Sequence, residues 1–386
     1  MNQRFEFVAP GRIIYGAGTL READATAKEF GRRALVVTGR DARRAEPLVA
    51  LLREHGVDAA IFSVCGEPEL ETVRQGATLG QKEKCELVVS IGGGSALDAG
   101  KAIAALLANG GDPLDYVEII GRGKALAKPS APFIAIPTTA GTGSEATRNG
   151  VLGSPEHRVK VSLRSPHLLP RLAIVDPELT RDLPPALTAA TGLDALTQLI
   201  EPYVCSRANP VTDALCAEGI RRAARSLPRA FENGHDDGAR DDMAVASLFG
   251  GLALANAGLG AAHGFAGPIG GLIPAPHGAI VAALLPDVMD ANLRALENRQ
   301  PAGEALRRYT EVARLVTGNK GAAARDGVEW ARKLVADLQI PRLSSHGLTG
   351  KDIAEVVEKA EKASSMKANP IALTREELAG ILERAL

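Results

Sequence analysis

The segment LVVSIGGGSALDAGKAIAALLA at residues 87–108 decides the fold class. It opens with Leu87–Ile91, an apolar and partly β-branched run that is typical of a buried strand. Gly92–Gly94 follow directly, and the small and apolar residues of Ala96–Ala108 then indicate a helix. A strand, a glycine turn and a helix in immediate succession predict one unit of an α/β fold.

Other strand-like runs of the same kind lie on both sides of this segment: Arg33–Thr38 (RALVVT), Phe133–Ile136 (FIAI) and Leu172–Val175 (LAIV). Helical stretches such as Asp41–Glu54 separate them. Alternating strands and helices predict a parallel sheet that is covered by helices on both faces. Ligands of such sheets bind at the carboxyl ends of the strands, where the glycine clusters of this chain lie.

The second half of the chain has a different texture, because Ala, Leu, Glu and Arg dominate and strand-like runs become scarce. Helices are predicted at Leu187–Val204, Val211–Ala230 and Asp241–Ala257, with a polar loop at Glu232–Asp242. A chain of 386 residues is also too long for one ordinary core. We therefore predict an α/β domain over residues 1–180 and an all-α domain over residues 181–386.

The composition excludes several classes of partner. Charged residues make up 24% of the chain and nearly balance, with a formal net charge of −1, which argues against a nucleic-acid or acidic-membrane partner. Aromatic residues make up only 3%, so stacking platforms for single strands are not expected.

The cysteines and the apolar runs indicate a cellular location. Cys65, Cys85, Cys205 and Cys216 form no CxxC pair, so neither a disulfide framework nor a cysteine zinc site is expected. The first residues, MNQRFEFVAPGR, lack an apolar signal core, and no uncharged apolar run reaches about 18 residues. We expect a cytoplasmic protein without a membrane span.

The glycine turn after Leu87–Ile91 has two interpretations. Free backbone N–H groups and the positive end of a helix dipole meet there, which suits a pyrophosphate, and Ser95 can cap the helix and donate to a phosphate oxygen. The turn matches neither GxGxxG nor a Walker loop. The alternative is a tight turn before a capped helix, without a ligand.

Pro137–Glu145 (PTTAGTGSE) follows the next strand and crowds hydroxyl side chains and glycines into one loop. Such a loop can bind ribose, phosphate or carboxamide groups, or it is only a Ser/Thr-rich turn. Gly39 and Arg40 end the strand Arg33–Thr38, where dinucleotide folds often carry an acidic residue for the ribose 2′-OH. Gly39 leaves room for a 2′-phosphate, and Arg40 is interpreted as an exposed surface residue.

A set of nitrogen and oxygen donors is a candidate metal site. Asp194 and Gln198 lie four residues apart in a predicted helix and so share one face. His263 and His277 come from two later segments, and together these side chains suit a divalent ion such as Fe, Zn, Ni or Mn. A metal with an open position polarises a carbonyl or stabilises an alkoxide. The alternative is that the histidines are core or capping residues.

Several long motifs in order resemble the iron-containing (group III) alcohol dehydrogenases over nearly the whole chain. These motifs are Tyr15–Gly18, Gly92–Ser95 with Asp98 and Lys101, Pro137–Glu145, Asp194–Leu196 with Ile200 and Glu201, His263, Pro276–Gly278, and Asn369–Pro370.

The resemblance implies a dehydroquinate synthase-like architecture, with a nucleotide-binding α/β domain, an all-α domain, and cofactor and metal between them. It implies NAD or NADP and a divalent ion, Fe²⁺ or Zn²⁺, acting on a small alcohol or aldehyde in a homodimer. The metal ligands would be Asp194, Gln198, His263 and His277, and both histidines would be catalytic. The residues implied to bind the cofactor are Gly39, Gly93, Gly94, Ser95, Asp98, Thr138, Thr139, Thr142 and Lys160.

The chain departs from the family pattern at three positions. The family usually has His where this chain has Gln198, often has a proton-relaying His where it has Gly267, and often has Asp at Gly39 in NAD-preferring members. These departures leave open NADP as cofactor, and metal-independent reduction of an activated carbonyl or enoyl acid, as in the maleylacetate reductases. A dehydroquinate synthase-like or glycerol dehydrogenase-like enzyme, or a non-catalytic nucleotide-binding protein, are further alternatives.

Overall fold

The structure is a computed structural model and describes residues 4–386, which divide into two units. The sheet unit comprises Ala9–Thr139 and Gly143–Thr180. The helical unit comprises Arg181–Leu386 with Ala140–Thr142 and the start of the chain up to Val8. No apolar signal core is expected in the N-terminal stretch MNQRFEFVAPGR. The first three residues of this stretch lie outside the described residues. The domains at residues 1–180 and 181–386 stay a prediction.

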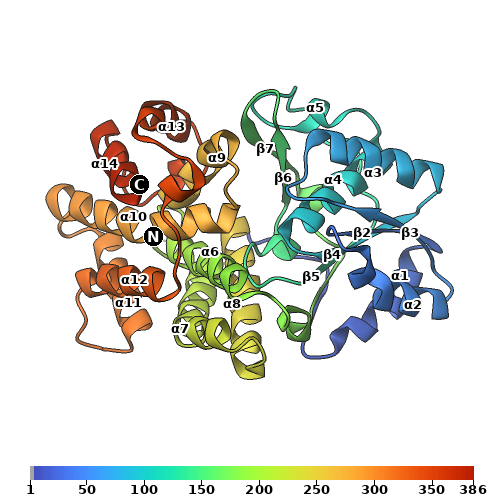
Figure 1. Ribbon diagram of the computed structural model, residues 1–386, viewed down its shortest axis with the longest axis horizontal. Helices are drawn as coiled ribbons and strands as arrows, with labels where there is room; N and C mark the ends of the chain where they lie inside the picture. The colour runs from blue at the N-terminus through green and yellow to red at the C-terminus, as the bar shows by residue number, and fades with distance from the viewer. Residues whose placement is uncertain (1–3) are drawn as a thin grey trace. The chain divides into compact units, whose positions relative to one another are not determined.

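A six-stranded parallel sheet forms the centre of the sheet unit (Figure 1), in the order β1-β8-β5-β4-β2-β3. Its strands are β1 (Ile13–Tyr15), β2 (Arg33–Thr38), β3 (Asp58–Ser63), β4 (Leu87–Gly92), β5 (Phe133–Pro137) and β8 (Leu172–Val175). The strands β2, β4, β5 and β8 are the four predicted runs, and the predicted parallel sheet is confirmed.

Helices cover both faces of this sheet: α1 (Ala23–Phe30), α2 (Glu46–Glu54), α3 (Leu70–Lys82) and α4 (Gly94–Asn109). Ala34 and Val36 of β2 pack with α1 and α2, whereas Leu35 and Val37 pack in the cluster of α3 and α4. Figure 1 shows the two helix pairs on opposite sides of the sheet. Burial on both faces explains why these strands are continuous apolar runs without polar alternation.

The strand order reverses between β2 and β4. The chain passes from β2 outward to its neighbour β3, and from β4 in the opposite direction to β5. Thr38 pairs with Ile91, so β2 and β4 end side by side. Gly39 and Gly92 therefore lie at the reversal, the point where open α/β sheets bind ligands.

A two-stranded antiparallel hairpin, which the sequence analysis does not predict, follows the Pro137–Glu145 loop. Its strands are β6 (Asn149–Ser154) and β7 (Val159–Arg164). Gly150 lets the hairpin backbone approach α4, because a Cβ there would lie 2.9 Å from the carbonyl oxygen of Asp98. A short helix, α5 (Pro113–Tyr116), follows α4.

The helical unit contains only helices and their connections among the described residues, so the predicted all-α second half is confirmed. The helices are α6 (Pro185–Val204), α7 (Pro210–Glu232), α8 (Asp237–Asn256), α9 (Ala261–Leu272), α10 (His277–Arg299), α11 (Glu304–Thr317), α12 (Ala324–Asp337), α13 (Ile353–Glu361) and α14 (Arg375–Ala385). The loop predicted at Glu232–Asp242 is wrong after Asp236, because the Asp236 side chain accepts a hydrogen bond from the backbone N–H of Ala239 and caps α8.

Helix α6 lies at the centre of the helical unit and packs against α7, α8 and α10. Its residues from Gly192 to Val204 are all buried. Asp194, Gln198 and Glu201 are among them, at spacings of four and three residues that put them on one face. A helix buried all round normally carries apolar residues, so these polar side chains need polar partners inside the unit.

No single helix within residues 4–386 is both long and apolar enough to cross a membrane. The consecutive helices α8 and α9 reach the required length and apolarity only when taken together, and they are bent by 94° relative to one another.

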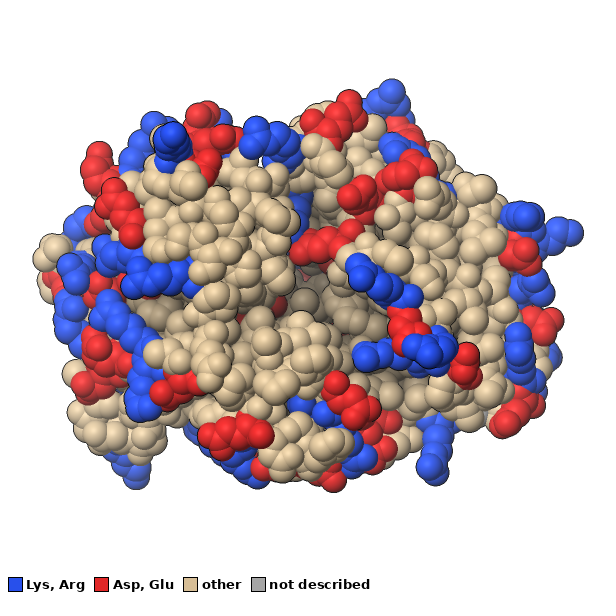
Figure 2. All heavy atoms as spheres, viewed as in Figure 1, with Lys and Arg blue, Asp and Glu red and all other residues tan. Residues whose placement is uncertain are grey.

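Charged side chains of opposite sign lie close together at many surface positions. On the face drawn in Figure 2, Lys and Arg side chains stand beside Asp and Glu side chains. Pairs such as Lys359–Glu355 and Lys333–Asp337 follow the helical spacing of four residues. Each exposed pair contributes at most about 1 kcal/mol, so packing and not surface charge decides the fold.

Replacing Gly100 with Ala is expected to destabilise the protein. A Cβ at this position of α4 would lie 1.9 Å from the Oγ of Ser90 and 2.8 Å from the ring of Phe133. Overpacking of this kind costs about 1–3 kcal/mol. Chemical denaturation should therefore give a lower free energy of unfolding for Gly100→Ala. Gly350→Ala, where a Cβ meets nothing within 4 Å, is the matched control. An equal decrease in the free energy of unfolding in both variants would contradict the close packing of α4 against the sheet.

Candidate functional site

The glycine and threonine loops predicted to bind a cofactor come together in the sheet unit. Gly92 pairs with Pro137 across β4 and β5, and Thr138 donates its backbone N–H to the carbonyl oxygen of Gly92 at 2.9 Å. A Cβ on Gly93 would lie 3.3 Å from the side chain of Thr139. The two loops are therefore neighbours at the carboxyl edge of the sheet.

Helix α4 begins in this place, because Gly93 is its N-cap residue and Gly94 its first residue. No side chain caps the helix end, and the helix runs for 16 residues. Its first N–H groups and its dipole thus favour an anion at Gly93, Gly94 and Ser95.

Asp98 and Lys101 of α4 fasten the threonine loop and the hairpin to the helix. The Asp98 carboxylate accepts hydrogen bonds from the hydroxyl of Ser144 at 2.5 Å and the backbone N–H of Val151 at 3.0 Å. Lys101 is fully buried and donates to the hydroxyl of Thr147 at 2.9 Å and the carbonyl oxygen of Asn149 at 2.6 Å. A cofactor contact of Asp98 stays a prediction, whereas its role in holding this loop is visible.

Of the other residues predicted to bind the cofactor, Gly39 lies beside Gly92, because a Cβ on Gly92 would be 3.6 Å from the backbone nitrogen of Gly39. Thr142 is half-buried in the short segment that groups with the helical unit. Lys160 lies on β7, and its ammonium group forms an ion pair with Glu67 at 2.5 Å. Gly39 ends β2, and a Cβ there would meet nothing within 4 Å. Their cofactor contacts stay predictions.

Glu145, in the same loop, is buried inside the sheet unit, with 2% of its surface exposed. Burial raises the pKa of its carboxyl to about 7, although the positive charge of Lys101 acts in the opposite direction. A carboxyl group in the threonine loop therefore changes its charge near neutral pH.

The free energy of unfolding of the cofactor-free protein should fall as the pH rises through 7. Folded Glu145 keeps its proton up to about pH 7, whereas the unfolded chain loses it near its ordinary pKa of 4.5. The stabilising contribution is complete below pH 4.5 and is lost as the pH rises through 7. Between pH 5 and pH 8, the free energy of unfolding of Glu145→Gln should rise relative to that of wild type by up to about 3 kcal/mol.

Urea denaturation at the two pH values measures this difference. Glu156→Gln, an exposed change in the β6–β7 turn, serves as the control and should follow wild type. Parallel pH profiles for Glu145→Gln and wild type would show that the Glu145 carboxyl does not titrate in this range.

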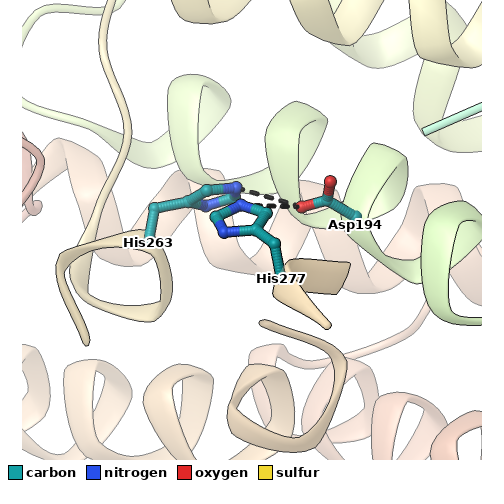
Figure 3. A group of neighbouring side chains, drawn as sticks. All are labelled: Asp194, His263 and His277. Carbon is teal, nitrogen blue, oxygen red and sulfur yellow. Dashed lines mark hydrogen bonds and ion pairs between the residues drawn. The ribbon is translucent and has the colours of Figure 1, made fainter. Parts of the chain in front are cut away.

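Asp194, His263 and His277 converge in the helical unit, as Figure 3 shows. They come from α6, from the first turn of α9 and from the first residue of α10. Asp194 Oδ1 lies 3.2 Å from His263 Nε2 and 3.8 Å from His277 Nε2. One donor atom from each residue falls within a group no more than 4.8 Å across.

This donor set fits a divalent metal. Two ligands that are each about 2.1 Å from one ion at a tetrahedral angle are about 3.4 Å apart, close to the distances between these atoms. Within residues 4–386, the buried oxygens Asp194 Oδ2 and Gln198 Oε1 have no hydrogen-bond partner. An unpartnered buried acceptor costs about 1–3 kcal/mol, and a cation beside Asp194 and Gln198 would satisfy both oxygens.

The charges of the cluster are strongly coupled. Burial lowers the pKa of His263, but the carboxylates of Glu201 and Asp194 outweigh burial and raise it to about 9. Burial raises the pKa of Asp194, but the hydrogen bond from His263 and the nearby His277 outweigh burial and lower it. A metal ion that binds His263 Nε2 must therefore displace a proton.

Two further positions, Gly267 and Glu201, bear on the surroundings of His263. Gly267 lies one turn after His263 on α9, and a Cβ there would meet nothing within 4 Å, so no side chain relays a proton from this position. Glu201, to which the sequence analysis gave no role, accepts a hydrogen bond from His263 Nδ1 at 2.7 Å. The sequence feature that could have identified Glu201 is its spacing, because it is an acidic residue on the same face of α6 as Asp194 and Gln198.

The comparisons with known proteins cover the chain from near its start to its end. Residues 10–177 match the sequence model described as "Iron-containing alcohol dehydrogenase". Residues 188–386 match "Fe-containing alcohol dehydrogenase family, C-terminal".

Individual relatives are similar over almost their full lengths. Alcohol dehydrogenase 4 of Schizosaccharomyces pombe is 37% identical over 98% of this chain and 89% of its own. The 1,3-propanediol dehydrogenase of Klebsiella pneumoniae is 36% identical over 99% of this chain and 98% of its own. The crystal structure of a 1,3-propanediol oxidoreductase superimposes with a TM-score of 0.92 at 35% identity and 100% coverage of both chains. The chain belongs to the iron-containing alcohol dehydrogenase family.

Proposed function

We propose that this protein interconverts a small alcohol and its aldehyde or ketone, using NAD or NADP and a divalent metal ion, Fe²⁺ or Zn²⁺. The observation that carries the proposal is the convergence of Asp194, His263 and His277, together with the buried oxygens Asp194 Oδ2 and Gln198 Oε1, which have no hydrogen-bond partner among residues 4–386. Family membership supports the reaction class, and the 1,3-propanediol named for the Klebsiella pneumoniae relative supports a small alcohol as substrate.

In this proposal residues 1–180 bind the dinucleotide and residues 181–386 hold the metal and the substrate. The N–H groups of Gly93 and Gly94 and the Ser95 hydroxyl hold the pyrophosphate at the positive end of α4. The other proposed cofactor contacts are Gly39, Asp98, Thr138, Thr139, Thr142 and Lys160. When bound, the nicotinamide ring supplies the hydride acceptor or donor.

Asp194, His263 and His277 would hold the metal, with Gln198 as a neutral fourth donor. When bound, the metal supplies the Lewis acidity that favours ionisation of an alcohol and polarisation of a carbonyl. Asp194 supplies a negative charge that stays ionised because its pKa is lowered. Burial of Asp194 and His263 keeps water from their side chains, which strengthens their electrostatic interactions. The two histidines are catalytic in this sense.

The protein is further proposed to act as a homodimer in the cytoplasm, with a small alcohol or aldehyde as its partner. The family resemblance supports the dimer, and analytical ultracentrifugation of the purified protein tests it.

The second candidate function is metal-independent reduction of an activated carbonyl or enoyl acid. The observation that favours it is Gln198, because an amide oxygen is a weaker ligand than imidazole and lowers the affinity of the site for metal. An already polarised substrate accepts hydride without strong Lewis-acid assistance.

Metal analysis combined with turnover separates the two candidates. Protein purified without a metal-affinity tag should contain stoichiometric iron or zinc by mass spectrometry. Its oxidation of NADH or NADPH with short aldehydes should be lost on chelation and restored by metal, because without the ion the site has no Lewis acid to polarise the carbonyl. Undiminished turnover without metal would favour the second candidate.

Two variants of Gln198 extend this experiment. Gln198→His should lower the dissociation constant for Zn²⁺ by about tenfold or more, because imidazole is the better ligand. Gln198→Leu, which removes the donor oxygen, should raise it. Equal zinc affinity in wild type and both variants would remove Gln198 from the ligand set.

Gly39 is expected to influence the choice between NAD and NADP. Gly39→Asp should lower kcat/KM for NADP relative to NAD by at least about tenfold, because a carboxylate repels a 2′-phosphate and accepts from a ribose 2′-OH. The side chain has room, since a Cβ meets nothing within 4 Å. Gly39→Ala is the uncharged control in the same steady-state assay. An unchanged ratio in Gly39→Asp would place the adenosine ribose away from the end of β2.

A further inference from the structure

Glu201 is buried on α6 and receives three hydrogen bonds from the beginning of α9. Its Oε2 accepts from the backbone N–H of Gly260 at 2.8 Å and from His263 Nδ1 at 2.7 Å. Its Oε1 accepts from the backbone N–H of Ala262 at 2.7 Å. The carboxylate, with 5% of the residue exposed, thus contacts both the helix end and the histidine ring.

These contacts determine which nitrogen of His263 faces the metal cluster. A carboxylate can only accept, so Nδ1 carries the hydrogen in the bond to Glu201. The other nitrogen, Nε2, lies 3.2 Å from Asp194 Oδ1 and points into the cluster. Histidine ligands of metals are commonly oriented in this way by a carboxylate on the opposite ring nitrogen.

The beginning of α9 has no cap from its own sequence, since its N-cap residue Gly260 offers no side chain. A Cβ on Gly260 would lie 2.9 Å from both Glu201 Oε1 and Asn369 Oδ1. Asn369 Oδ1 accepts from the backbone N–H of Ala261 at 3.1 Å. Glu201 and Asn369 therefore replace the missing cap, and only Glu201 also touches His263.

A buried network continues from Asn369 and supplies a control. The Asn369 side-chain amide donates to Asn292 Oδ1 at 2.6 Å, and the Asn292 amide donates to the hydroxyl of Tyr309 at 3.0 Å. Tyr309 is 2% exposed. Removing its hydroxyl weakens the same interior network without changing any contact of Glu201 or His263.

We propose that Glu201 is a positioning residue for the metal centre, which holds His263 with Nδ1 protonated and Nε2 directed to the ion. The inference rests on the proposed metal site and assigns to Glu201 a role in metal affinity that acts through His263.

The test is zinc binding by full-length Glu201→Gln. A glutamine offers one acceptor oxygen and an amide group that donates, so it cannot serve all three N–H groups that converge on Glu201. Competition with a chromophoric chelator should show Zn²⁺ binding weakened by about 10- to 100-fold. Tyr309→Phe should lose stability but bind Zn²⁺ within about threefold of wild type. Equal weakening in both variants would reduce Glu201 to a general structural role.

A spectroscopic measurement on wild type keeps the proposal testable if Glu201→Gln does not fold. In Zn²⁺-loaded protein with ¹⁵N-labelled histidine, His263 should show a protonated Nδ1 and a metal-bound Nε2. A metal-bound Nδ1 would overturn the proposal. Wild type that takes up no Zn²⁺ would overturn the metal site itself, whereas zinc binding by Glu201→Gln with wild-type affinity would overturn only the role of Glu201.

Discussion

The helical unit is organised around one constraint, which is that α6 carries three polar side chains into a buried environment. Asp194, Gln198 and Glu201 lie on one face of a helix whose residues are buried from Gly192 onward. Each buried polar group requires a partner, so the beginning of α9 and the beginning of α10 are placed where their donors meet this face. The candidate metal site and the support for His263 are two consequences of the same requirement.

The sheet could be predicted because strands buried on both faces are uninterrupted apolar runs, as in Arg33–Thr38. The hairpin β6–β7 was missed because its strands alternate between buried and half-buried residues and lie outside the main sheet. The polar, glycine-containing stretch at the start of α8 predicts a loop, although Asp236 caps a helix there. Local composition does not reveal whether a polar segment is capped.

The site could be predicted only in part. The four-residue spacing of Asp194 and Gln198 places them on one face. The donor types make His263 and His277 candidate partners, but they leave open that the histidines are core or capping residues, and the family resemblance favours the metal site. The contact of Glu201 with His263 joins residues 62 positions apart, and sequence spacing contains no information about it. The cofactor contact of Asp98 stays a prediction, and the hydrogen bonds that its carboxylate accepts from Ser144 and Val151 do not follow from the spacing of the motif. Side-chain partners across the fold are set by packing.

Asp194, His263 and His277 of the candidate metal site differ in their access to solvent. The side chains of Asp194 and His263 are 1% and 5% exposed, whereas that of His277 is 35% exposed. His277 is therefore the side of the candidate metal site that solvent reaches. A divalent ion held by these side chains would be open to solvent on the side of His277 and shielded from it by Asp194 and His263.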